Sequence, residues 1–253
     1  MFQLFFIITS LMALISISSA TELRVVSLNV NYANTNAAET MATVLKQKPD
    51  LIFLQESNAA FEKWSSKDYP HSWFTTDKEN VAGGFGILSK YPITEKEWIP
   101  KIASFGAQMV LIEAESKLIQ LFNLHLNPAG LPESGDYGQA MHRMMVNGST
   151  HIKELKHIMA KRKKGMPVIV AGDLNGKPRM AAVRTLTERM DFTDSMAGDE
   201  ESVSWTAEFK KTKFQARFDY ILCSPELKPS DAKVITIKDS DHKLVSAKLE
   251  LKK

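Results

Sequence analysis

The chain has 253 residues, of which 44% are hydrophobic and 24% are charged, and its formal net charge is +3. This composition is typical of a globular protein and excludes a disordered or low-complexity chain. The mild positive charge is compatible with a phosphate-bearing substrate but does not require one. Cys223 is the only cysteine, which excludes an internal disulfide, so the core has to be stable without one.

The first 20 residues are predicted to form a signal peptide that is cleaved before Thr21. The run from Phe2 to Ala20 carries no charge, and the small residues at Ser18 and Ala20 fit an export cleavage site. We therefore expect a secreted or periplasmic protein with no stable membrane span after cleavage. The run is also just long enough to cross a bilayer, so an uncleaved N-terminal anchor is the alternative.

Residues 21–253 are predicted to form a single domain with many strands and few helices. No internal repeat, low-complexity tract or linker divides them. In the first half of the chain, a helix is expected between Asn36 and Pro49. Short apolar or alternating runs predict strands at residues 23–30, 50–55, 71–75, 85–89, 93–98, 108–114 and 118–126.

The second half begins with a polar loop at residues 127–138, which contains Pro128 and Gly130 and is the best candidate for a mobile segment beside a site. Two helices are expected, separated at Asn147 and Gly148, and a third helix starts at Pro178. The region from 194 to 213 is polar and has no predicted element. The expected helices are 139–146, 150–163 and 178–190, and the expected strands are 168–175, 217–223, 234–237 and 245–251.

The stretch V-I-V-A-G-D-L-N at residues 168–175 is the centre of the chain. It predicts a buried strand that delivers polar side chains to its end. An ionised carboxylate inside a doubly buried strand is costly, so Asp173 must lie where the strand emerges and must have a cation or a proton-carrying partner. Gly172 lacks a Cβ, and we expect it to let a substrate approach the backbone.

Several other predicted strands also end in polar residues. The set contains oxygen donors and two histidines but no clustered cysteines, which suits hard cations such as Mg²⁺, Mn²⁺ or Ca²⁺ better than zinc. A single strand-end asparagine usually caps a turn, so the prediction depends on their joint occurrence. The members are Asn29, Asn31, Glu56, Asn123, His125, Asp173, Asn175, Asp219, Asp241 and His242.

These residues lie in motifs that follow one another along nearly all of the chain after residue 20. The motifs are S-L-N-V-N at 27–31, L-Q-E at 54–56, G-G-F-G-I-L-S-K-Y-P-I at 83–93, N-L-H-L at 123–126, G-D-L-N at 172–175, F-D-Y-I-L at 218–222 and S-D-H at 240–242. In this order they resemble the endonuclease/exonuclease/phosphatase superfamily, which includes pancreatic-type deoxyribonucleases, repair nucleases, neutral sphingomyelinases and inositol polyphosphate 5-phosphatases.

The resemblance implies a four-layer α/β/β/α sandwich, in which two mixed β-sheets are flanked by helices. It also implies a metal site at Glu56, helped by Asn29, Asn31 and Asp241, and holding Mg²⁺ or Mn²⁺, with Ca²⁺ as an alternative. The remaining roles are implied in the same way. Asp173 orients or deprotonates the attacking water, Asn175 and His125 donate hydrogen bonds to the phosphate, and His242, oriented by Asp219, acts as acid, base or polarising residue.

Such roles agree with phosphodiester chemistry, because a divalent ion and nearby donors neutralise the charge that builds up in the transition state. At Asn31 some repair nucleases carry an acid, so a second tightly held metal is not assumed. The motif around Arg217 departs from the Trp-x-Asp-Arg form that is usual in 5-phosphatases. Residues Lys177, Arg179 and Arg217 are candidates for phosphate contacts, and solvation in a loop is the alternative for each.

The sequence therefore favours an exported, metal-dependent nuclease that acts on DNA or RNA as a monomer without a protein partner. A phospholipid or sphingomyelin phosphodiesterase, or a phosphomonoesterase, is the enzymatic alternative. A catalytically silent binding module with the same fold is an alternative of another class. The complete set of acids and histidines argues against that module, since inactivation normally removes a member.

Overall fold

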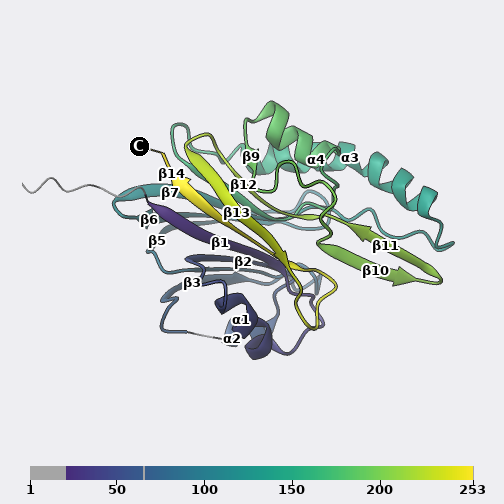
Figure 1. The fold of residues 1–253 in the computed structure, drawn as a ribbon, viewed down its shortest axis with the longest axis horizontal. Coiled ribbons are helices and arrows are strands. Elements are labelled where there is room, and N and C mark those ends of the chain that lie inside the picture. The colour runs from purple at the N-terminus through teal and green to yellow at the C-terminus, as the bar shows by residue number, and fades with distance from the viewer. Residues whose placement is uncertain (1–20, 65, 253) are drawn as a thin grey trace, which may run out of the picture.

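The structure, a computed structural model, describes residues 21–64 and 66–252. The predicted signal peptide lies outside the described residues. Two six-stranded sheets pack face to face (Figure 1). In spatial order, the first sheet contains β13 (Leu227–Ile235), β14 (Leu244–Leu251), β1 (Glu22–Asn29), β2 (Leu51–Gln55), β4 (Phe85–Ser89) and β3 (His71–Thr75). The second contains β5 (Ile93–Ile99), β6 (Ala107–Ala114), β7 (Lys117–His125), β8 (Val168–Asp173), β12 (Asp219–Cys223) and β9 (Thr193–Asp194).

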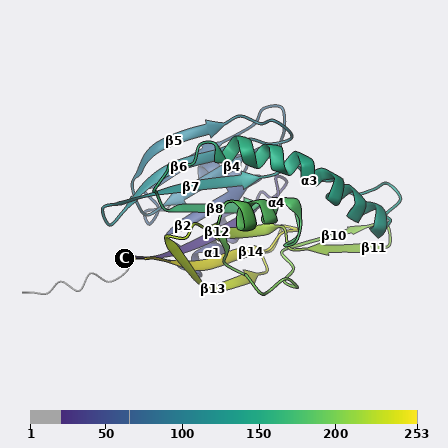
Figure 2. The same ribbon diagram turned by 90° about the horizontal axis from the view of Figure 1, so that it is seen from above.

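Helices cover the outer face of each sheet, which confirms the predicted α/β/β/α sandwich. Figure 1 shows α1 and α2 on one side and α3 and α4 on the other, and Figure 2 shows α3 and α4 lying over the second sheet. Both sheets are mixed, because β1 pairs parallel with β2 and β7 pairs parallel with β8 while their other neighbours are antiparallel. The helical elements are α1 (Ala37–Leu45), α2 (Ala59–Lys63), α3 (Tyr137–Met159), α4 (Ala181–Arg184) and a following π-helical turn, Thr185–Arg189.

Three apolar clusters hold these layers together. Between the sheets, Phe53 of the first sheet packs with Ile169 and Ile221 of the second. On the outer faces, Met41 of α1 packs on the first sheet and Leu155 of α3 packs on the second. Because strands buried on both faces have apolar side chains on both sides, β2, β8 and β12 read as continuous apolar runs rather than alternating ones.

The α3 helix is continuous, so the predicted break at Asn147 and Gly148 is wrong. Asn147 is buried and donates from Nδ2 to the carbonyl of Asn127 at 2.6 Å. A Cβ on Gly148 would lie 2.8 Å from the Cβ of Ala181, so this glycine allows α3 to approach α4 closely. Tertiary contacts at both residues thus replace the turn that the Asn-Gly pair predicts.

Other boundaries also differ from expectation. The polar region contains an unpredicted hairpin, β10 (Trp205–Phe209) and β11 (Thr212–Ala216), which extends beside the N-terminal end of α3 (Figure 2). Tyr137 of α3 stacks on Phe214 of this hairpin with ring centroids 6.0 Å apart. Strand β12 begins at Asp219 rather than at 217. In the described part of the chain, no helix is both long and apolar enough to cross a membrane.

Candidate active site

Three adjacent strands of the second sheet place His125, Asp173 and Asp219 side by side. His125 ends β7 and is in register with Asp173, which ends β8, and Asp219 begins the antiparallel strand β12 opposite Asp173. All three residues are almost completely buried. The His125 Nε2 lies 3.6 Å from Asp173 Oδ2. The sheet register therefore fixes the spacing of these three groups.

The first sheet contributes Asn29 and Glu56 from the other side of the same pocket. Asn29 ends β1, and its Nδ2 donates to Glu56 Oε1 at 3.0 Å and to Asp173 Oδ2 at 3.3 Å. Glu56 directly follows β2 with a left-handed backbone (φ 53°), as does Asn31 after β1 (φ 65°) and Asn175 after β8 (φ 45°). Non-glycine residues rarely adopt this conformation, and it turns the chain sharply where each of these strands ends.

The loop between β13 and β14 supplies Asp241 and His242. Its position is fixed by Ser240, whose hydroxyl donates to the Asn29 carbonyl at 2.8 Å. The two carboxylate oxygens of Asp241 accept from Asn31 Nδ2 at 3.1 Å and from Trp205 Nε1 at 3.0 Å. His242 is thereby brought beside Asp173 of β8 and Asp219 of β12, which precede it by 69 and 23 residues in the sequence.

His242 lies between two carboxylates. Its Nδ1 donates to Asp219 Oδ2 at 2.9 Å, and its Nε2 is 3.6 Å from Asp173 Oδ2. Burial alone would lower the pKa of His242, but the charges of Asp219 and Asp173 outweigh it and raise this pKa. Ser204 also donates to Asp219 Oδ2, at 2.7 Å. The arrangement holds a protonated imidazole in one orientation.

Other pKa shifts at the site follow from burial. Burial raises the pKa of Asp173, although the charge of His242 opposes the rise. Burial also raises the pKa of Glu56, against hydrogen bonds from Asn29 and the backbone of Tyr32. Burial and the charge of His242 lower the pKa of His125 to about 3, which keeps its ring neutral. The site therefore combines a cationic and a neutral histidine.

These groups line a pocket of about 250 Å³, which we call the catalytic pocket. Its other walls include aromatic residues and the loop after β7. Phe105 stacks on the His125 ring at a centroid distance of 3.8 Å, and Trp205 stacks on Phe218 at 5.0 Å. The lining residues are Glu56, Ala82, Phe105, His125, Pro128, Ala129, Gly130, Leu131, Met144, Asp173, Asn175, Trp205, Phe218, Asp241 and His242.

The donor set fits a bound cation. Glu56, Asp173 and Asp241 all face the catalytic pocket, and no lysine or arginine is among its lining residues. Among the lining residues only protonated His242 offsets their charge, and negative charge on buried Asp173 and half-buried Glu56 is costly without a cationic partner. Asp173, Asp219 and His242 also form a buried group that could bind a metal, with ligand atoms all within 4.8 Å of one another.

The two asparagines expected as metal ligands have other contacts. Asn29 directs its Nδ2 toward the carboxylates, while its Oδ1 accepts from the backbone N–H of Asn31 at 3.0 Å. Asn31 donates to Asp241, and its Oδ1 accepts from the N–H of Ala33 at 3.0 Å. Both amides therefore orient carboxylates in this structure rather than presenting a free oxygen to a metal.

Of the residues expected to contact phosphate, Asn175 lies at the catalytic pocket and Arg217 does not. Asn175 lines the catalytic pocket, and its Nδ2 donates to the Leu126 carbonyl at 2.9 Å while its N–H donates to Asp173 Oδ1 at 2.8 Å. Arg217 is buried and pairs with Asp194 at 2.7 Å. Arg217 therefore has a structural role. The expectation that it contacts phosphate is wrong, because a substrate that binds from solvent cannot reach this buried side chain.

Lys177 and Arg179 lie outside the catalytic pocket. Both line a neighbouring pocket, where Arg179 pairs with Glu200 at 2.7 Å. The expectation for Gly172 is also corrected, because a Cβ there would lie 1.9 Å from the Leu124 carbonyl oxygen. Its backbone conformation (φ 142°) also favours glycine. The absence of a side chain at Gly172 therefore makes room for the neighbouring strand β7 and not for a substrate.

Sequence reasoning missed the aromatic residues Phe105, Trp205 and Phe218 and the hydroxyl of Ser204. Of these, Ser204-Trp205 carried a detectable signal, because a tryptophan in an otherwise polar stretch needs an apolar or stacking environment. Phe105 lies in a short segment between strands β5 and β6 and carried no comparable signal.

Comparisons with known proteins agree with this geometry. The model of the Endonuclease/Exonuclease/phosphatase family matches residues 26–242. The chain therefore belongs to this family, whose enzymes are phosphoesterases, and membership supports a hydrolase that acts on phosphoesters. No curated protein is matched in a search with the sequence.

Solved structures with the same fold have low sequence identity to this chain. TDP2 from D. rerio has a TM-score of 0.70 at 20% identity, covering 90% of this chain and 99% of that chain. An endonuclease/exonuclease/phosphatase from Beutenbergia cavernae has a TM-score of 0.68 at 15% identity, covering 91% and 72%. Another from Bacteroides vulgatus has a TM-score of 0.65 at 17% identity, covering 92% and 100%. At these identities the likeness establishes the fold.

Proposed function

We propose that this protein is a divalent-metal-dependent phosphodiester hydrolase, and more specifically a nuclease that cleaves DNA or RNA by attack of water on phosphorus. One observation carries the proposal. Glu56, Asp173 and Asp241 converge with the His242–Asp219 pair in a single pocket that contains no lysine or arginine. The D. rerio TDP2 structure was solved with a single-strand DNA product, which supports a nucleic acid as the substrate class.

Glu56 would be the principal residue to hold Mg²⁺ or Mn²⁺, with Asp241 beside it, and Ca²⁺ is the alternative. When bound, the ion neutralises charge on the phosphate and stabilises the oxyanion that develops during attack. The Asp173–Asp219–His242 group is the weaker candidate, because His242 Nδ1 is occupied by Asp219 and a protonated imidazole cannot bind a metal.

Asp173 is the residue that would accept the proton of the attacking water. Its raised pKa brings it closer to neutral pH, where a general base works best. Hydrogen bonds from Asn29 Nδ2 and from the N–H of Asn175 hold its two oxygens in fixed directions. The carboxylate therefore keeps one orientation without needing to be reorganised during the reaction.

The two histidines would act on the phosphate and the leaving group. Protonated His242 donates from Nε2 to a phosphate oxygen or to the departing oxygen, while Asp219 holds its ring and stabilises its charge. Neutral His125, stacked on Phe105, contributes an uncharged donor from the end of β7. The two donors have different supports, since the sheet register sets the position of His125 and the loop between β13 and β14 sets that of His242.

The test is hydrolysis of DNA and RNA by the purified protein with Mg²⁺ or Mn²⁺. We expect cleavage that stops when a chelator is added and returns when the metal is restored. The Asp173→Asn variant is the matched control for a contaminating nuclease, because it keeps the size of the side chain and removes the base. Equal activity in chelator, or full activity of the Asp173→Asn variant, would contradict the proposal.

Phospholipid phosphodiester hydrolysis is the second candidate. It is favoured by one observation, the exposed apolar side chains of Tyr137, Met145 and Val146 on α3. Plasmid DNA, RNA and sphingomyelin micelles assayed side by side separate the two. A preference for nucleic acid that weakens steeply as salt increases supports the nuclease, and a preference for micelles assigns the enzyme to lipids.

We also propose that the protein is exported and that its mature form is a single domain that starts at Thr21. The basis is the uncharged apolar run that ends in small residues at positions 18–20. Intact-mass measurement of the protein from the producing cells tests it, since the mature chain should lack residues 1–20. A chain that still begins at Met1 would contradict cleavage.

A further inference from the structure

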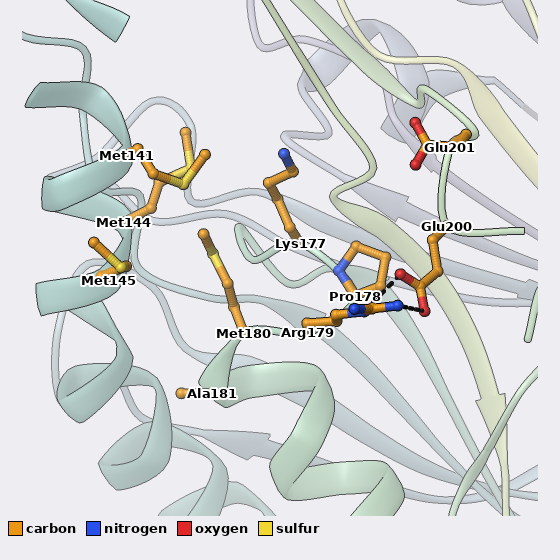
Figure 3. A pocket seen from close by; sticks show the side chains of 10 residues that line it. All are labelled: Met141, Met144, Met145, Lys177, Pro178, Arg179, Met180, Ala181, Glu200 and Glu201. Carbon is orange, nitrogen blue, oxygen red and sulfur yellow. Dashed lines mark hydrogen bonds and ion pairs between the residues drawn. The ribbon is translucent and has the colours of Figure 1, made fainter. Parts of the chain in front are cut away.

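A second pocket, of about 630 Å³, lies next to the catalytic pocket. Four of the 12 methionines of the chain line it, and we call it the methionine pocket. Figure 3 shows Met141, Met144 and Met145 projecting from α3 toward Met180 and Lys177, with Glu200 and Glu201 on the far side. These four methionines belong to none of the three apolar clusters that form the core, so their gathering at an open pocket is not explained by core packing.

Local structure explains why the methionines gather there. Met141, Met144 and Met145 follow the i, i+3, i+4 spacing that puts residues on one face of a helix. Met180 is the residue directly before α4, which packs against α3. Met145 is 61% exposed, so this helix face is not fully covered by the rest of the domain.

The methionine pocket is adjacent to the catalytic pocket. Met144 lines both of them. Lys177, on the methionine pocket, follows Asn175, on the catalytic pocket, by two residues of the same loop. A substrate group in the methionine pocket is therefore attached close to a phosphate in the catalytic pocket.

We propose that the methionine pocket receives one base of a single-stranded nucleic acid whose neighbouring phosphate occupies the catalytic pocket. The proposal rests on the nuclease function proposed above. Thioethers make favourable contacts with aromatic rings, and the unbranched methionine side chain adapts to rings of different shape. The volume lies within the range of sites that bind small molecules. The pocket thus accepts any base rather than selecting one.

The charged residues at the pocket favour a base over an acyl chain. The Lys177 ammonium and the Glu201 carboxylate have no hydrogen-bonded partner in the described part of the chain. A base edge carries both acceptors and donors, which an ammonium and a carboxylate can meet. An acyl chain would desolvate both charges and return no hydrogen bond.

Occupation of the pocket has a consequence for substrate form. A base can enter it only when it has left the stack of a double helix, which costs unstacking energy in a duplex and little in a single strand. We therefore expect the protein to cleave a single strand faster than the same sequence in a duplex.

The experiment compares wild-type protein with the double variant Met141→Ala/Met180→Ala. The control is Met166→Ala, a half-buried methionine that packs on the second-sheet core away from this pocket. Wild type is first assayed on single-stranded DNA and on single-stranded RNA. The nucleic acid that is cleaved faster is then used as two oligonucleotides, one normal and one with a single abasic site next to the cleaved phosphate. Thermal midpoints verify folding, and Met145→Ala replaces the double variant if that variant is unstable.

Wild type should bind the abasic substrate more weakly, with a KM about tenfold higher. The double variant should show a KM raised by a similar factor for the normal substrate and little further change for the abasic one, with kcat preserved. Equal losses on both substrates, unchanged KM in the variant, or a loss confined to sphingomyelin micelles would overturn the base-binding proposal. Absence of nucleic acid cleavage by wild type would instead overturn the nuclease function itself.

Discussion

The catalytic pocket and the methionine pocket share Met144 but are built in opposite ways. The catalytic pocket is formed by polar side chains at the ends of strands, and nearly every one of them is held by a hydrogen bond to another. The methionine pocket is formed by one face of α3 and the start of α4, with flexible apolar side chains and few polar contacts.

From this difference we expect the catalytic pocket to carry out the chemistry and the methionine pocket to recognise the substrate. A reaction that needs fixed donors and a fixed base belongs on rigid strand ends, since misplaced groups lose catalytic effect. Recognition of a variable group suits side chains that repack at low cost. Changes in the catalytic pocket should therefore alter turnover, and changes in the methionine pocket should alter substrate binding.

The largest effect is expected for His242→Ala. Loss of the protonated imidazole should reduce kcat by about 10³-fold, the size typical of a general acid with a charge-stabilising role. Assays at saturating substrate test this. The thermal midpoint should also fall, because the change leaves the buried carboxylates of Asp219 and Asp173 without their cationic partner, so kcat is compared per folded molecule. A collapsed midpoint with normal turnover per folded molecule would instead make His242 a structural residue.

Arg217→Leu should destabilise the protein without altering the chemistry. The change leaves Asp194 buried without its partner, which costs about 3 kcal/mol of unfolding free energy. Urea unfolding measures this, and kcat per folded molecule should stay constant because Arg217 does not line the catalytic pocket. Arg184→Ala breaks an exposed pair with Glu188 and is the matched control, for which little change in the free energy of unfolding is expected. A large loss of kcat in Arg217→Leu would instead show that Arg217 contributes to the catalytic site.

Much of the catalytic pocket could be predicted from the sequence, because its residues directly follow short apolar runs. Glu56 after β2 and Asp173 at the end of β8 are visible in this way. Parallel strands and their register then bring His125 beside Asp173. The family resemblance was needed to join these residues to His242, because nothing in the spacing along the chain shows that a distant loop reaches them.

Other features depended on contacts that the sequence does not display. Arg217 looked like a surface cation, and only the structure shows its buried pairing with Asp194. The Asn147-Gly148 pair predicted a turn, but packing against α4 and a bond to Asn127 keep it helical. The methionine spacing on α3 was readable, yet the same pattern in a core helix would look identical.

A third prediction concerns the loop that follows β7, whose residues 128–131 form a wall of the catalytic pocket. Glu154 of α3 accepts from the N–H of Asn127 at 3.2 Å, and burial raises its pKa to about 7, although this hydrogen bond opposes the rise. In the unfolded chain the pKa is about 4.3. Between these values the folded state binds the proton more often than the unfolded state does, so the free energy of unfolding falls as pH rises.

Glu154→Gln removes this titration. Between pH 5 and about 7.5, titration of Glu154 should lower the free energy of unfolding of wild type by up to about 3 kcal/mol. The variant lacks this group, so its free energy of unfolding should fall by correspondingly less over the same range. Urea unfolding across the pH range measures the difference. The exposed Glu62→Gln is the control and should follow wild type. Parallel curves for Glu154→Gln and wild type would show that Glu154 does not titrate in this range.

The smallest effect is expected for Phe105→Leu. Phe105 stacks on His125 and positions its ring, so the loss of stacking should lower kcat by about threefold, corresponding to less than about 1 kcal/mol. KM should stay the same, which is the reverse of the result expected for the methionine variants. Phe105→Tyr keeps an aromatic ring and should restore kcat. If Phe105→Leu raised KM instead, the wall of the catalytic pocket would also bind substrate, and the separation between the two pockets would fail.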